Sequence, residues 1–133
     1  LEDWISSDEL YEDLLTSNQN DGQALNNYSY TLAERGINLR NALDMAEKAI
    51  ELEPGNPVYF DTIGWIYFKM KKFEKALEYI EQSLSKNPEN AVVLEHLGDV
   101  LMKVDRPEDA RTYYEKALAI DKENDRLQKK IKE

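Results

Sequence analysis

The residues best suited to chemistry are two carboxylates and the only histidine of the chain, Glu95, His96 and Asp99, within one predicted helical turn. Two carboxylates and a histidine can ligate a divalent transition metal. Adjacent helical residues point about 100° apart, however, so Glu95 and His96 cannot easily share an ion. As a general base, His96 would need an orienting partner and a nucleophile, and no serine or cysteine is close in sequence. We therefore expect no metal, no cofactor and no catalysis here.

A second candidate is the segment from Asn18 to Gly22, which resembles the middle of a calcium-binding loop. If Gly22 is the sixth loop residue, Tyr28 takes the twelfth position, where a bidentate glutamate is required. This segment is therefore predicted to be a turn between helices.

The overall charge narrows the classes of partner. The chain has 133 residues, with 27 Asp and Glu against 17 Lys and Arg, a net charge of −10. Binding to nucleic acid or to an anionic membrane needs clustered cations, so both are disfavoured. The pairs Lys71-Lys72 and Lys129-Lys130 are too short to outweigh the acidic surroundings, and we expect them in solvated turns and caps. No apolar run approaches the ~18 residues that span a bilayer, so no direct membrane insertion is predicted.

Cysteine is absent, which excludes disulfides, thiolate metal sites and thiol nucleophiles. The compartment stays undetermined, because proteins without cysteine occur everywhere. The first residue is Leu1 with no basic region after it, and we interpret it as a cut end of a longer parent.

The elements that would position these side chains form an internal repeat. Ala42, Ala76 and Ala110 are spaced by 34 residues, and so are Gly64 and Gly98. Within each unit apolar residues step by three and four, as on one face of a helix. Each unit is therefore predicted to be two antiparallel helices, with small residues where the two backbones approach closely. Three units are predicted, at 22–56, 57–90 and 91–124, and the first has one extra residue in its central turn.

This unit resembles the tetratricopeptide repeat (TPR). The second unit matches the TPR pattern with Phe60, Ile63-Gly64, Tyr67, Ala76, Ile80, Ser83 and Pro88. The third has Lys122 where proline is expected, so its last helix either runs on or gives way directly to the terminal helix. The resemblance implies an all-α fold, a right-handed superhelical solenoid of antiparallel helix pairs. Strings such as Leu32-Ala33-Glu34-Arg35-Gly36 are similar to a bacterial group of long, multi-repeat and sometimes exported TPR proteins.

The two ends are interpreted by the same pattern. Residues 1–21 are predicted to be the second helix of a truncated preceding repeat, followed by a turn. Residues 125–133 carry Leu127 and Ile131 four apart among charged residues, which predicts a C-terminal capping helix. The whole chain is then one folded unit.

The resemblance also predicts the working surface, the concave groove lined by the first helix of each unit. Trp65 lies off the predicted core stripe, so it either anchors a partner or packs against Tyr30 and the neighbouring repeat. Aromatic side chains flanked by carboxylates favour a peptide with apolar anchors and Lys or Arg. The predicted groove residues are Asn26, Tyr30, Asp61, Trp65, Phe68, Glu95, Asp99 and Met102.

The same surface departs from the carboxylate clamp of chaperone-binding TPR domains, which resembles this fold but needs lysine, arginine and asparagine at set positions. Those positions here hold Asn26, Tyr30, Thr62, Val92 and His96. Acidic C-terminal tails are therefore disfavoured as ligands of the groove.

The sequence thus predicts a non-catalytic scaffold module that binds a peptide or protein segment in its concave groove. The alternative is self-association, in which residues 4–15 of the truncated repeat dock against another copy and give a homo-oligomer. The compartment and the partner's identity are not predicted.

Overall fold

The computed structural model describes residues 21–132, and this part of the chain consists of helices joined by short turns, with no strand. Within residues 21–132, no helix combines the length and the hydrophobicity of a membrane-spanning segment. The predicted helix within residues 1–21 and the self-association surface at 4–15 fall outside the described residues, apart from Asp21. The helices are α2 (Gly22–Arg35), α3 (Leu39–Leu52), α4 (Pro57–Lys69), α5 (Phe73–Lys86), α6 (Ala91–Lys103), α7 (Pro107–Ile120) and α8 (Asp125–Lys132).

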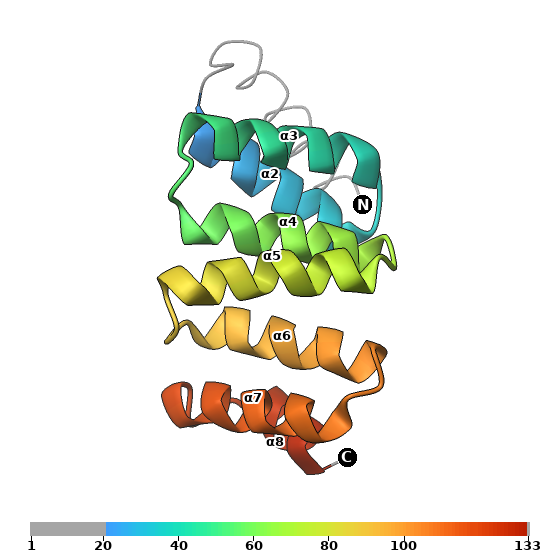
Figure 1. The fold of residues 1–133 in the computed structure, drawn as a ribbon, viewed down its shortest axis with the longest axis vertical. Coiled ribbons are helices and arrows are strands. Elements are labelled where there is room, and N and C mark those ends of the chain that lie inside the picture. Colours follow the sequence, from blue (N-terminus) through green and yellow to red (C-terminus); the bar gives the residue numbers. More distant parts are fainter. Residues whose placement is uncertain (1–20, 133) are drawn as a thin grey trace.

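Consecutive helices run antiparallel and stack along one long axis (Figure 1). In this view α3, α5 and α7 lie in the front layer, and α2 and α8 lie behind α3 and α7. The extensively packed pairs are α2 with α3, α4 with α5 and α6 with α7, and the pairs contact one another through α3 with α4 and α5 with α6. The predicted all-α solenoid of helix pairs is confirmed.

The first helix of each pair is capped by a side chain. Asp21 accepts a hydrogen bond from the Ala24 amide at 3.1 Å. Asn56 and Asn90 accept in the same way from Val58 and Val92, at 2.9 and 3.0 Å. These caps satisfy amides that a helix leaves without an internal partner. The second helices α3, α5 and α7 have no such side-chain cap.

The small residues of the repeat allow the helices of a pair to approach closely. Ala42, Ala76 and Ala110 are all fully buried. A Cβ atom added to Gly64 would lie 2.6 Å from Ile80 Cγ1, and one added to Gly98 would overlap the Tyr114 ring. The close contact predicted at these positions is therefore present in the structure.

The C-terminal end resolves the alternative raised by Lys122. Helix α7 stops at Ile120, and a short turn leads to α8 at Asp125. The turn is closed by the Asn124 amide, which donates to the Asp121 carbonyl at 3.2 Å. Leu127 of α8 is 1% exposed, and this short helix packs firmly against α7.

Candidate binding surface

The predicted groove residues all lie on the first helices of the three pairs, α2, α4 and α6. Four of these eight side chains contact the next first helix or α8 instead of pointing freely into solvent, namely Asp61, Trp65, Glu95 and Asp99. Side-chain contacts join residues 31 or 35 positions apart, for example Glu34 with Trp65 and Asp61 with His96. The separations of 31 and 35 residues differ by four, which is about one helical turn. Both therefore reach side chains on the same face of the following helix.

Trp65 is enclosed between its neighbours. Its indole Nε1 donates to Glu34 Oε1 at 2.6 Å, from α4 to α2. Its ring stacks on Phe68 at 4.6 Å and on His96 at 4.0 Å between ring centroids. The residue is 7% exposed. Of the two interpretations of Trp65, packing against the neighbouring repeats is the one that the structure has.

His96 is buried between α4 and α6. It is 6% exposed, and its Nδ1 lies 3.0 Å from Asp61 Oδ1 and 3.1 Å from Oδ2. Asp61 is also 6% exposed. The imidazole thus fills the space between α4 and α6, held by Asp61 at its edge and by the Trp65 ring at its face. Its partners lie in the preceding repeat, so neighbouring sequence gave no sign of them.

Glu95 and Asp99 were predicted to face ligand cations, but helix α8 supplies those cations. Arg126 donates to both Glu95 carboxylate oxygens, at 2.7 and 2.8 Å. Lys130 donates to Glu95 at 2.6 Å and to Asp99 at 2.9 Å. A bidentate arginine and a shared lysine are strong partners for carboxylates. The acidic end of the predicted groove is therefore occupied within the chain.

These contacts change how Glu95 ionises. Burial alone would raise its pKa, but the hydrogen bonds from Arg126 and Lys130 outweigh burial and lower the pKa to about 2. For Lys130, burial lowers the pKa, and the hydrogen bonds to Glu95 and Asp99 raise it further than burial lowers it. Both groups are thus charged at neutral pH and stabilise each other.

Sequence reasoning missed this role of α8, although one signal was present. Arg126 and Lys130 are four residues apart, as are Glu95 and Asp99. Two acids and two bases at matched helical spacing can pair across neighbouring helices. The sequence predicts Lys129-Lys130 in a solvated cap, whereas Lys130 is partly buried and pairs with Glu95 and Asp99.

Asp99 also accepts a hydrogen bond from the Tyr114 hydroxyl at 2.7 Å. Burial and the Asp99 carboxylate raise the pKa of Tyr114. This bond joins α6 to α7, so Asp99 connects three helices through Lys130 and Tyr114.

The opposite end of the surface is open. A hollow of about 420 Å³ lies across α2, α4 and the start of α6. Asn26 lines it, is 6% exposed, and its Oδ1 has no hydrogen-bond partner among the described residues. Val58 and Val92, at 48% and 53% exposed, flank the opening. Asp61, Thr62 and Tyr30 also line the hollow.

Tyr30 is half-buried beside this hollow. Burial and then the carboxylates of Glu34 and Asp61 raise its pKa to about 12. Its hydroxyl therefore keeps its proton and can donate a hydrogen bond over the whole physiological range.

Met102, the last predicted groove residue, lies apart from this hollow. It is 51% exposed and lines a separate, smaller hollow with Tyr114, Lys130 and Ile131. Within residues 21–132 no three His, Asp or Glu side chains are grouped so that they could hold a metal ion. The structure therefore divides the predicted site into an open end on α2 and α4 and an end covered by α8.

A family model described as tetratricopeptide repeat matches residues 67–132. A comparison with curated protein sequences finds no match. The matched segment includes α5, α6, α7 and α8, so it contains the end of the surface that α8 covers.

Solved structures of similar fold cover most of this chain. A crystal structure of MamA matches with a TM-score of 0.79 and 19% identity, over 97% of this chain and 75% of that one. The first TPR of Spaghetti (RPAP3), bound to the HSP90 peptide SRMEEVD, matches with a TM-score of 0.77 and 21% identity, over 84% and 89%. YrrB, described as a TPR protein with an unusual peptide-binding site, matches with a TM-score of 0.75 and 22% identity, over 91% and 62%.

Proposed function

Because this chain belongs to the tetratricopeptide-repeat family, we propose that it is a non-catalytic scaffold module that binds a peptide segment in the hollow across α2, α4 and α6. Proteins of this family are generally interaction scaffolds. The proposal therefore starts from a role in protein-protein interaction. The hollow and the ligand chemistry are our proposal.

The observation that carries the proposal is the unpaired oxygen of Asn26. A buried acceptor without a donor costs about 1–3 kcal/mol, and the residue that carries this acceptor lines an open hollow. A ligand amide that donates to this oxygen would remove that cost. A peptide has such an amide at nearly every residue, which favours an extended polypeptide over a small apolar molecule.

The surroundings of Asn26 favour a ligand with apolar and basic groups. Val58 and Val92 are exposed apolar side chains on either side of the hollow, and burying them would stabilise a complex. Asp61 adds negative charge beside the Tyr30 hydroxyl. A segment with one apolar side chain and a nearby Lys or Arg matches the exposed valines, the Asp61 carboxylate and the Tyr30 hydroxyl.

The other predicted groove residues take different places in this proposal. Trp65 and Phe68 do not line the hollow, and their rings stack on each other. Glu95 and Asp99 meet a ligand only if Arg126 and Lys130 of α8 move away. Met102 can contact a ligand that extends beyond the hollow, since half of its side chain is exposed.

Two of the structural relatives support a peptide as the ligand class. The RPAP3 domain was solved with an HSP90 peptide, and YrrB is described as having a peptide-binding site. Their identities to this chain are low, so their own ligands are not transferred to it.

The test is a titration of the chain with a library of short basic peptides that each carry one aromatic or aliphatic residue. We expect backbone amide shifts at α2, α4 and the start of α6. Asn26→Leu should lower the affinity for the peptide at least about tenfold, or about 1.4 kcal/mol. Asn41→Ala on α3 should leave that affinity unchanged. Shifts confined to α3, α5 and α7 would overturn the proposed hollow.

A further inference from the structure

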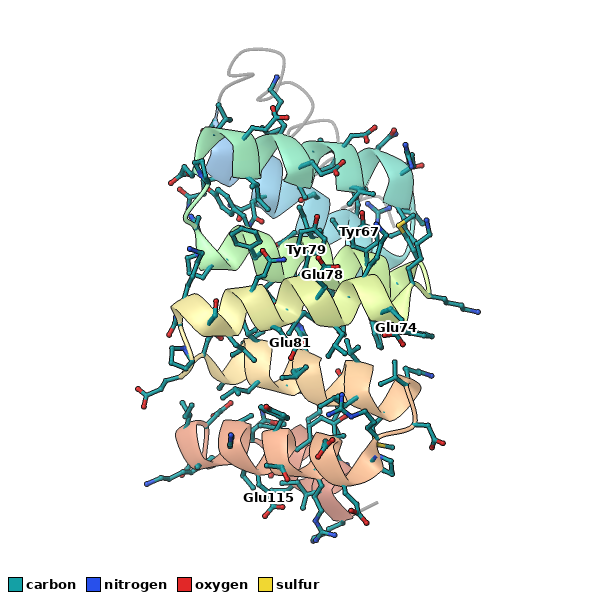
Figure 2. The ribbon with its side chains drawn as sticks, in the orientation of Figure 1. Tyr67, Glu74, Glu78, Tyr79, Glu81 and Glu115 are labelled. Carbon is teal, nitrogen blue, oxygen red and sulfur yellow. The ribbon has the colours of Figure 1, made fainter. Side chains whose placement is uncertain are left out.

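A third hollow lies on the edge of the array, where the α4–α5 turn meets the end of α6. Both turns at this edge, after α4 and after α6, lie on the right of Figure 1, and Figure 2 labels Glu74 beside the first of them. The floor contains Phe73 and Val104, which are partly buried. Glu74 is the single carboxylate among the lining residues. The rest of the lining is Lys71, Lys72, Lys75 and Lys103.

These lysines are not neutralised within the described part of the chain. All four are exposed, and no ion pair to a carboxylate is found for any of them among residues 21–132. Lys75 Nζ lies 5.5 Å from the centre of the Tyr67 ring. The chain as a whole carries a net charge of −10, so this hollow is a local exception to its charge.

The next repeat provides an internal comparison. There the equivalent turn is neutralised, because Arg106 Nη2 lies 2.7 Å from Asp109 Oδ2. Lys72 and Lys75 occupy the positions equivalent to Arg106 and Asp109. Because both are cations, the same ion pair cannot form. Thirty-four residues after Lys71, Lys72 and Lys75, the chain has Asp105, Arg106 and Asp109.

The lysines near the start of α5 do not stabilise that helix. Lys72 is the N-cap residue of α5, its side chain makes no capping hydrogen bond, and Lys75 lies in the first turn. Cations at a helix N-terminus are disfavoured by the helix dipole, by about 0.3–1 kcal/mol at exposed positions. The same uncapped amides and the same lysines would together favour an anion that comes from outside the chain.

The geometry distinguishes a polypeptide from a bound phosphate group. In the turn, the amides of Met70, Lys71 and Lys72 donate to α4 carbonyls at 2.9, 3.0 and 2.9 Å. These three amides are therefore not available to cradle a phosphate, which leaves only the uncapped first amides of α5 for an anion at this turn. The lysines instead surround an open hollow with apolar side chains at its floor.

We propose that this lysine hollow docks an acidic segment of a partner protein, with Asp and Glu side chains facing the lysines and an apolar side chain on Phe73 and Val104. The site is independent of the hollow at Asn26, which lies on other residues and favours a basic ligand. Failure of one proposal therefore leaves the other in place.

The experiment measures binding of a fluorescein-labelled peptide of Asp and Glu residues with central leucines, by anisotropy at low salt. Lys71→Glu/Lys103→Glu should weaken binding at least about tenfold relative to the unchanged chain. Lys48→Glu/Lys129→Glu changes the net charge equally at exposed positions elsewhere, and should change affinity less than about twofold. Circular dichroism of both variants checks that the helices are retained.

Three outcomes would overturn the proposal. The first is unchanged affinity in Lys71→Glu/Lys103→Glu, and the second is an equal loss in the control variant, which would indicate only whole-molecule charge. The third is displacement of the peptide by inorganic phosphate, or by phosphatidylserine vesicles, at concentrations as low as those of unlabelled peptide.

Discussion

The imidazole of His96 and the carboxylate of Asp61 form a buried contact between successive repeats, with Nδ1 3.0 Å from Oδ1. Asp61 lies on α4 and His96 on α6, 35 residues apart. The contact has the same register as the pair Glu95 and Lys130 one repeat later. First helices are therefore joined by polar side chains as well as by apolar packing.

Replacing His96 by phenylalanine tests this contact. His96→Phe keeps a ring against Trp65 but leaves Asp61 buried without its partner. We expect the free energy of unfolding to fall by about 1–3 kcal/mol, measured by urea denaturation. The double variant Asp61→Leu/His96→Phe should recover part of this loss, because both polar groups are then removed. A single variant as stable as the unchanged chain would contradict the structural role.

The packing of α8 on the preceding helices should weaken at low pH. The pKa of Glu95 is lowered from its ordinary value of 4.5 to about 2 in the folded chain. A lowered pKa contributes stability above the unfolded value, and that stability is lost as the pH falls through the folded value. We expect α8 amides to lose hydrogen-exchange protection between about pH 4.5 and about pH 2, measured by NMR.

Glu95→Gln is the control for this pH dependence. The variant cannot ionise at this position, so α8 should already be less protected at neutral pH and should change less between about pH 4.5 and about pH 2. A transition in acid as large as in the unchanged chain would assign the effect to other carboxylates.

Gly98 and Gly55 should respond differently to the same substitution by alanine. A Cβ at Gly98 meets the Tyr114 ring, whereas a Cβ at Gly55 meets nothing within 4 Å. We expect Gly98→Ala to reduce stability by about 1–3 kcal/mol, the usual cost of overpacking. Gly55→Ala should leave stability unchanged or raise it slightly, because the unfolded chain loses freedom. Urea denaturation of the two variants compares them directly, and equal midpoints would show that the helices adjust freely.

Trp65→Ala should act on stability before it acts on any ligand. The ring packs between Phe68 and His96, so its removal opens a cavity and leaves Glu34 without the indole donor. We expect a loss of about 3–5 kcal/mol in unfolding free energy. A variant of unchanged stability that binds peptide at least about tenfold more weakly would restore Trp65 as a direct anchor.

Helices α4 and α5 also pack aromatic side chains against each other. Tyr67 and Tyr79 lie beside each other between α4 and α5 (Figure 2), with ring centres 5.6 Å apart. Burial is the main cause that raises the pKa of both hydroxyls. Tyr67 fits the TPR pattern, and its ring could be expected in the interface of the pair, whereas its contact with Tyr79 required the structure.

The sequence by itself determined the helix pairs and their close packing, because these depend on local rules. The spacing of Ala42, Ala76 and Ala110 and the steps of three and four within each unit are properties of a single helical hairpin. Small residues at fixed places leave only one way for two helices to approach closely, and the buried alanines follow from that.

The partner of each polar side chain was decided only by the tertiary structure. Asp61, Glu95 and Asp99 are acidic in the sequence whether a ligand or the chain itself neutralises them. Whether a ligand or the chain neutralises them depends on the register of one first helix against the next. That register brings residues 31 or 35 positions later in the sequence into contact with the acids. The lysine hollow follows the same logic, since Lys103 joins Lys71 and Lys72 only when two turns of different repeats are placed side by side.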